Sequence, residues 1–383
     1  MTAPVPMKVL VLGGAGFIGR HVAAALAARG HAVVIGTRRP RRAARRLPAE
    51  LHAAQRREAH LERLLTPAAW EPLVWNVAAV VNAVGILRSR GRETYRRVHH
   101  LAPAALARAC ERYGVRLVHV SALGLREDLR SRFLRSKLAG ETAVAASGAD
   151  YSIVRPALLD GENGYGARWL RRVARWPVHL VPADARGRLA VMDVRDLGEA
   201  VAALCETDGA KWREVELGGP ACPTIGEYLA ALRAEHSARP AIRITVPAWL
   251  ARIGSHACDL AHFSPFSFGH LELMRRDNMP RVNALRDLIG RAPTPVVRFP
   301  SLLPHNAEER RAAALGATTR PAAASTPPAG AGPSWSAAPS APRPARRSIA
   351  ACPFAARVPC GWPRLLRRAV LPGRTVPSGP KAP

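Results

Sequence analysis

Lysine and acidic residues are both scarce in this sequence. Lysine provides only four of the 57 basic residues, and 28 acidic residues leave a formal net charge of +29. A surface this basic attracts phosphates, acidic lipids or nucleic acid. The charge is accompanied by no homeodomain, zinc-finger or RNA-binding signature. We therefore expect no specific nucleic-acid partner, and the sequence identifies no protein partner.

Cysteine and long apolar runs are scarce as well. The six cysteines form no C-x-x-C pair, which argues against a zinc site, so we expect no bound metal. No stretch approaches the roughly 18 apolar residues of a membrane-spanning helix. The first residues, MTAPVPMKVLVLGGAGF, lack the basic and apolar regions of a secretory signal peptide. These absences predict a cytoplasmic protein.

What the sequence does contain is a glycine-rich turn near its start. The apolar run Val9–Leu12 leads into GGAGFIG, and an amphipathic segment, Phe17–Arg29, follows. This order predicts a buried strand, a tight turn and a helix. Gly13 permits the turn, Gly16 lets the backbone approach a pyrophosphate, and Gly19 lets the helix pack closely on the strand. We expect a dinucleotide site at Gly13, Gly14, Ala15, Gly16, Phe17, Ile18 and Gly19.

A second strand, Ala32–Ile35, is expected after this helix, and basic residues follow it. An acidic residue at the end of that strand usually holds the ribose 2′-hydroxyl of NAD, whereas an arginine suits the 2′-phosphate of NADP. Arg38 and Arg39 occupy this position. We therefore expect NADP as the cofactor, with NAD as the alternative. The other interpretation of the two arginines is a solvated basic loop.

Further strands are expected later in the chain. The apolar runs Val77–Val84, Val115–Val120 and Tyr151–Val154 predict buried parallel strands. A short third strand is expected near Leu51–Gln55, where the pattern is poor. Ser121 directly follows a strand and is either a site residue or part of a turn. The residues expected to reach the cofactor from these strand ends are Asn82, Ala83, Val84, Gly85 and Pro156.

Taken together, these motifs resemble the short-chain dehydrogenase/reductase superfamily. The resemblance is strongest to its atypical branch, which includes the nucleotide-binding accessory subunit of respiratory complex I and NmrA-like and epimerase-like proteins. It covers residues 7–235 well and 236–300 loosely. The motifs that carry it are GGAGFIG at 13–19, TRRP at 37–40, NAVG at 82–85, VHVSALG at 118–124, SKLAGE at 136–141, VRPALLDG at 154–161, VMDVRDLGEAV at 191–201 and LGGP at 217–220.

The resemblance implies an α/β fold, a doubly wound parallel-sheet Rossmann fold of about seven strands. Residues 7–215 are expected to form the NAD(P)-binding Rossmann domain, and residues 216–300 a small C-terminal substrate lobe packed on it. Residues 301–383 hold 15 of the 34 prolines and only two acidic residues. Such a segment buries too little apolar surface to offset its ordering entropy, so we expect a disordered tail. Its arginine clusters either stay solvated or touch an anionic membrane.

The resemblance also implies a catalytic site. In catalytic members a Ser, a Tyr and a Lys act together, and Ser121 and Lys137 match the first and the last. The Lys of these members also binds the nicotinamide ribose, so Lys137 is expected to bind the cofactor as well. The Tyr position is Phe133, which has no proton to give. Two other residues are candidates for the acid–base role of the missing tyrosine. One is Lys137, acting as the base with a pKa lowered by burial, and the other is Tyr165, from a glycine-rich loop. Another departure is His99, where many relatives carry Asn; of the adjacent pair His99 and His100 we expect one to be buried and one solvated.

Two functions follow from these residues. The first is an NAD(P)-binding oxidoreductase or epimerase-like enzyme with a small-molecule substrate, which the retained Ser121 and Lys137 favour. The alternative is a non-catalytic dinucleotide-binding sensor or an assembly or stabilising subunit, which Phe133 favours. The sequence names neither the substrate nor the oligomeric state.

Overall fold

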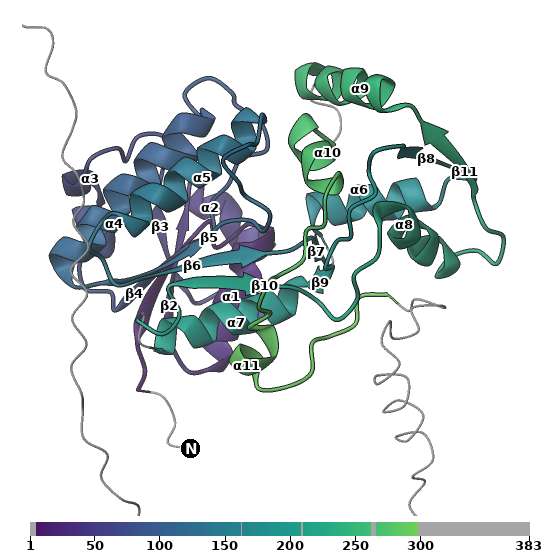
Figure 1. Cartoon of the computed structure of the whole chain (residues 1–383). Coiled ribbons are helices and arrows are strands. Elements are labelled where there is room, and N and C mark those ends of the chain that lie inside the picture. The colour runs from purple at the N-terminus through teal and green to yellow at the C-terminus, as the bar shows by residue number, and fades with distance from the viewer. Residues whose placement is uncertain (1–4, 162, 208–209, 262–265, 298–383) are drawn as a thin grey trace, which may run out of the picture. The chain divides into compact units, whose positions relative to one another are not determined.

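A computed structural model describes residues 5–161, 163–207, 210–261 and 266–297 (Figure 1), and the predicted disordered tail lies outside them. In this part of the chain a seven-stranded parallel sheet has the order β10-β6-β5-β4-β1-β2-β3. The strand order reverses between β1 and β4, where ligands of such sheets bind. The predicted doubly wound sheet is confirmed. Its strands are β1 (Lys8–Leu12), β2 (Ala32–Thr37), β3 (Gln55–Glu58), β4 (Ala79–Asn82), β5 (Arg116–Val120), β6 (Tyr151–Pro156) and β10 (Glu214–Leu217).

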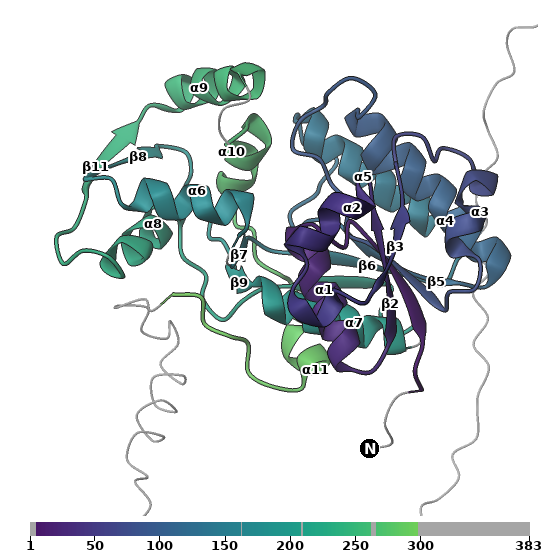
Figure 2. The same ribbon diagram turned by 180° about the vertical axis from the view of Figure 1, so that it is seen from behind.

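Helices cover both faces of this sheet (Figures 1 and 2). Alternate side chains of a strand face opposite sides. Strand β1 accordingly sends Val9 and Val11 into one core, and Leu10 and Leu12 into the other. The first core is closed by α1 (Phe17–Ala28), α7 (Val194–Glu206) and α11 (Leu285–Ile289). The second is closed by α3 (Pro67–Val74) and α4 (Ala102–Tyr113), and α5 (Arg132–Ala145) packs beside α4.

Local signals set the ends of several helices. The Asp193 carboxylate accepts a hydrogen bond of 2.7 Å from the Arg195 N–H and so caps α7. Thr224 and Glu227 form a reciprocal capping box at the start of α8 (Ile225–Ala234). Gly114, with φ +60°, ends α4 in the left-handed conformation that glycine adopts without strain.

Two elements differ from the sequence-based expectation. The third strand was expected near Leu51–Gln55, but a 3₁₀ turn, Ala49–Leu51, comes first and β3 begins only at Gln55. Leu51 is buried in the core beneath α1, so its apolar side chain contributes to packing and not to a strand. A π-helical turn, Arg96–Leu101, directly precedes α4 and is not among the elements that the sequence predicts.

A smaller lobe is built from two separate stretches of the chain. It contains α6 (Tyr165–Ala174), β8 (Val178–Pro182), α8, β11 (Ile242–Val246), α9 (Ala248–Ala261) and α10 (Phe268–Met274). Its core joins residues of α6 and β8 to residues of α8. The short strands β7 (Leu159–Asp160) and β9 (Met192–Asp193) pair at its base. The predicted boundary at residue 215 lies within β10, so the division at this residue stays a prediction.

We predict opposite effects for two helical glycines. A Cβ on Gly140, in α5, would lie 1.9 Å from the His99 carbonyl oxygen of the π-helical turn. Gly140→Ala should therefore lower the free energy of unfolding by about 1–3 kcal/mol, the usual cost of overpacking. Gly254, in α9, has open space at its Cβ, so Gly254→Ala should raise that free energy by about 0.5–1 kcal/mol through helix propensity. Urea unfolding measures both, and a stabilised Gly140→Ala protein would contradict the packing.

Candidate functional site

The glycine-rich turn links β1 to α1 by a backbone-to-backbone contact. Gly13 has φ +74°, and its N–H donates to the Gly36 carbonyl oxygen at 2.8 Å. A Cβ on Gly19 would lie 2.3 Å from the Gly13 carbonyl oxygen, so α1 can pack here only with glycine. Gly16 is the N-cap of α1 and provides no side-chain cap. The first N–H groups of this helix are therefore available to an anionic ligand.

This turn borders a pocket of about 840 Å³ at the carboxyl ends of the strands. Most of the residues expected to bind the cofactor line it, as do all three positions of the expected catalytic site. These lining residues are Gly13, Ala15, Gly16, Phe17, Ile18, Arg38, Arg39, Ala83, Val84, Gly85, Ser121, Phe133 and Lys137. The structure therefore brings together residues from five separate parts of the chain.

Four expected cofactor residues lie behind the pocket wall. A Cβ on Gly14 would touch Ile35 of β2, and Gly19 packs on the turn. Asn82 is fully buried; its amide N–H donates to His119 Nδ1 at 3.1 Å, and its Oδ1 accepts from the Val84 N–H. Pro156 is buried at the end of β6. Asn82 thus positions the pocket-lining Val84 backbone, without lining the pocket itself.

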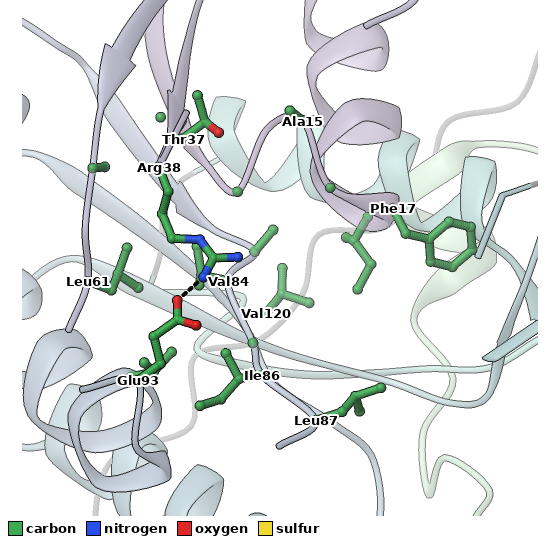
Figure 3. A pocket seen from close by; sticks show the side chains of 18 of the residues that line it. Ala15, Phe17, Thr37, Arg38, Leu61, Val84, Ile86, Leu87, Glu93 and Val120 are labelled. Carbon is green, nitrogen blue, oxygen red and sulfur yellow. Dashed lines mark hydrogen bonds and ion pairs between the residues drawn. The ribbon is translucent and has the colours of Figure 1, made fainter. Parts of the chain in front are cut away.

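The basic end of β2 contains a contact that the sequence analysis missed. Arg38 forms an ion pair with Glu93, which precedes the π-helical turn (Figure 3). Arg39 and Arg42 line the same side of the pocket. An acidic residue therefore does reach this position, from 55 residues away in the sequence. Spacing along β2 alone contains no signal for such a contact.

Ser121 and Lys137 both face the pocket. The Ser121 side chain is buried, and its Oγ has no hydrogen-bond partner among the described residues. Enclosure by neighbouring groups lowers the pKa of Lys137 to about 8, although the Glu141 carboxylate opposes this shift. Glu141 is itself bound to Arg155 at 2.7 Å. A lysine in this state is able to exchange a proton near neutral pH.

Aromatic rings surround Phe133, at the position where the superfamily carries its tyrosine. Its ring centroid lies 5.9 Å from that of Tyr95, 5.6 Å from that of His99 and 6.2 Å from that of His270. Tyr95 is a phenol in this cluster, but its hydroxyl donates to the Leu87 carbonyl oxygen at 2.8 Å. The cluster therefore places no phenolic proton on the pocket at residue 133.

His99 has a structural role in the same region. Its Nε2 accepts a hydrogen bond of 3.0 Å from the Ile86 N–H, and its Nδ1 lies 2.9 Å from Ser136 Oγ. Burial lowers the pKa of His99 well below its usual value, and the nearby Lys137 adds to this. The expectation of one buried and one solvated histidine is partly confirmed, since His99 is buried while His100 is only partly exposed.

Tyr165, the other expected source of a proton, lies at the start of α6 and is half-exposed. It lines the pocket together with Gly166.

Across the described residues, no group of three His, Cys, Asp or Glu side chains is placed to hold a metal ion. In the same part of the chain, every helix is too short or too polar to span a bilayer.

Comparisons with known proteins agree with this geometry. The profile of the NAD dependent epimerase/dehydratase family matches residues 9–218. A ceramide reductase of Caulobacter vibrioides is 30% identical over 226 residues, 55% of this chain and 68% of that protein. The mitochondrial NADH dehydrogenase (ubiquinone) 1 alpha subcomplex subunit 9 of Arabidopsis thaliana is 28% identical, over 55% of this chain. The chain spans only 53% of that plant protein.

Solved structures resemble the fold at low sequence identity. A Citrobacter sp. triphenylmethane reductase superposes with a TM-score of 0.59 at 17% identity, covering 76% of this chain and 96% of that one. A UDP-N-acetylglucosamine 4-epimerase from Bacillus cereus gives a TM-score of 0.54 at 15% identity, covering 83% and 99%. At these identities the likeness concerns the fold alone.

The buried histidines predict an acid-sensitive fold. Burial, together with Lys137, lowers the pKa of His119 to about 3, and burial lowers that of His270 to about 4. Both imidazoles stay neutral in the folded state at pH 5, while the unfolded chain takes up protons below about pH 6.5. Stability should therefore fall as the pH drops from 7 to 5, by about 2 kcal/mol for each histidine.

Urea unfolding at several pH values measures this effect. His119→Gln removes one titrating group and should reduce the loss between pH 7 and 5 by about 2 kcal/mol. The control is His236→Gln, at an exposed position. It should leave the loss of stability between pH 7 and 5 in place, because His119 and His270 are unchanged. A free energy of unfolding that does not change between pH 7 and 5 would contradict the burial of these rings.

Proposed function

The chain belongs to the NAD dependent epimerase/dehydratase family, and on this premise we propose that it is an NADP-dependent oxidoreductase that reduces a carbonyl group of a small molecule. The observation that carries the proposal is the pocket, where the glycine-rich turn, Ser121 and Lys137 meet. A protein that only binds the dinucleotide requires the glycine-rich turn alone. A buried serine without a partner and a lysine of lowered pKa are what a reaction requires in addition.

The residues present fit a dinucleotide. The turn is open to a pyrophosphate because Gly16 has no side chain, and the first N–H groups of α1 would hold the phosphates. Arg38, Arg39 and Arg42 would hold the 2′-phosphate of NADP. Glu93 opposes this preference, since it already pairs with Arg38 and repels a phosphate. When bound, the nicotinamide supplies a hydride to the substrate carbon.

Lys137 would supply the proton in place of the missing tyrosine. With a pKa of about 8 its ammonium group is mostly protonated at neutral pH, and it can give a proton to the substrate oxygen as negative charge develops there. The Ser121 hydroxyl, which has no other partner among the described residues, would donate a hydrogen bond to the same oxygen. Phe133 contributes an apolar wall and no proton.

We propose that the substrate is itself apolar. The apolar residues that line the pocket include Val84, Ile86, Leu87 and Phe133. The relative from Caulobacter vibrioides is, by its name, a reductase of ceramide, a lipid. A binding-only protein is the second candidate, because Phe133 is held in its aromatic cluster. Turnover of NADPH with apolar ketones distinguishes the two.

Cofactor preference can be tested at the end of β2. Arg38→Ala combined with Arg39→Ala should weaken NADPH binding by roughly 10- to 150-fold, because hydrogen bonds to charged groups contribute about 1.5–3 kcal/mol. NADH binding should change little. Glu93→Gln should strengthen NADPH binding, since it releases Arg38 and removes a negative charge. Calorimetry measures all affinities, and wild-type protein that binds NADH and NADPH equally would refute the preference.

The proton donor can be tested at residues 133 and 137. In wild type, kcat/KM for ketone reduction should fall as the pH rises through about 8, because Lys137 loses its proton there. Lys137→Ala should reduce turnover by about 10²–10⁴-fold, the usual contribution of a general acid. Phe133→Tyr adds a phenol four residues before the lysine and should raise turnover, and adding Lys137→Ala to it should remove the gain.

NADPH affinity serves as the control for these variants, since it separates cofactor binding from proton transfer. If the wild type already turns over well and Phe133→Tyr does not raise turnover, we would assign the role of proton donor to Tyr165. If wild type and all variants bind NADPH tightly but oxidise none of it with any ketone, the binding-only candidate replaces the enzyme.

A further inference from the structure

Helix α9 presents its apolar side chains to solvent. Trp249, Ile253 and Leu260 are 65%, 59% and 81% exposed. At 100° per residue these three positions fall within about 40° of one another, so they form one stripe along the helix. The opposite side, which contacts the lobe, carries the small buried residues Ala251 and Ser255. This pattern is the reverse of an ordinary surface helix, in which the apolar side faces the core.

The neighbouring ribbon has the same property. Strand β11 pairs with β8 in parallel, and Ile244 lies opposite Leu180 in this register. Ile242, Ile244 and Leu180 are all exposed. Only Pro247 separates β11 from α9 in the chain. We call the seven exposed side chains of these elements the apolar lobe face: Leu180, Ile242, Ile244, Trp249, Leu250, Ile253 and Leu260.

The elements that carry this face are themselves basic, although the neighbouring α8 contributes the exposed Glu227, which lines a pocket with Arg243. Residues 165–182 contain no Asp or Glu, and residues 239–261 contain only Asp259. That carboxylate is paired with Arg88 at 3.0 Å. The exposed charged residues of these two stretches are arginines: Arg168, Arg172, Arg175, Arg239, Arg243 and Arg252. An apolar face that contains tryptophan and belongs to arginine-rich elements is complementary to the interface of an anionic bilayer.

The carboxyl end of α9 is also tied to the rim of the pocket. Arg88 donates to the carbonyl oxygens of Cys258 and Phe266, at 3.3 and 2.8 Å. It directly follows Ile86 and Leu87, which line the pocket. In both views α9 lies at the top of the lobe, above α10 (Figures 1 and 2). A surface that binds α9 would therefore lie near the pocket entrance.

We propose that the apolar lobe face docks the protein on an anionic lipid bilayer, with α9 lying in the plane of the interface. Apolar patches on soluble proteins mark sites of interaction, and here the exposed arginines of the same elements favour a negatively charged lipid surface. Docking brings membrane-dissolved molecules to the pocket rim held by Arg88. This docking goes beyond the proposed function, and binding to vesicles can be measured without any turnover of a substrate.

The experiment is flotation of the full chain with vesicles. One set contains phosphatidylcholine alone, and the other contains equal parts of phosphatidylcholine and phosphatidylglycerol. The wild-type protein should float with the anionic vesicles and much less with the neutral ones. Trp249→Glu combined with Ile253→Glu should reduce the bound fraction at least tenfold, because two charges would have to enter the apolar layer. Both positions are exposed, so the melting temperature should change little.

The matched control is Trp75→Glu, which changes a tryptophan of similar exposure, 63%, at the end of α3. It should bind vesicles as the wild type does. The proposal is overturned if wild-type protein does not float with anionic vesicles, or if the Trp249 and Ile253 variant floats unchanged, which would assign binding to the basic tail. It is also overturned if light scattering shows a dimer that this variant dissociates, since a second copy then covers the face.

Discussion

The contact between the glycine-rich turn and α1 is the constraint on which the site depends. Gly19 approaches the Gly13 carbonyl so closely that no side chain fits between them. This approach lets α1 begin directly at the pocket, and it aligns the helix against β1 and α7. If α1 were held one side chain further away, its first N–H groups would no longer border the pocket. A packing requirement and a binding requirement therefore coincide at these glycines.

The region around residue 133 shows how a catalytic position can be filled by packing. The ring of Phe133 contacts Tyr95, His99 and His270, and His99 in turn holds the Ile86 backbone by a hydrogen bond. Neutral, buried imidazoles fit such an apolar cluster, which is consistent with their lowered pKa values. The same enclosure disfavours the charge of Lys137 and lowers its pKa. The aromatic cluster around Phe133 and the lowered pKa of Lys137 thus both belong to a desolvated wall of the pocket.

The smaller lobe differs from the Rossmann core in how much apolar surface it leaves exposed. Its own core is formed by α6, β8 and α8, and this core leaves apolar side chains of β11 and α9 exposed. Exposed apolar area of this kind lowers solubility unless another surface covers it. Tyr165 and Gly166 of the lobe line the pocket, and its exposed apolar side chains form the surface that we propose for docking.

The sequence by itself determined the strands of the parallel sheet, the glycine-rich turn and the absence of a phenol at Phe133. The turn and most of the strands have local patterns of residue type and spacing, and the alternation of strands with helices predicts that the strands pair in parallel. Only the tertiary structure decided the pairing of Arg38 with Glu93, the position of β3 and the lowered pKa of Lys137. It also decided that the apolar stripe of α9 faces solvent. The spacing of apolar residues along the sequence defines an apolar stripe on a helix. Contacts between segments that are distant in the sequence determine whether that stripe is buried and which charged side chains form ion pairs.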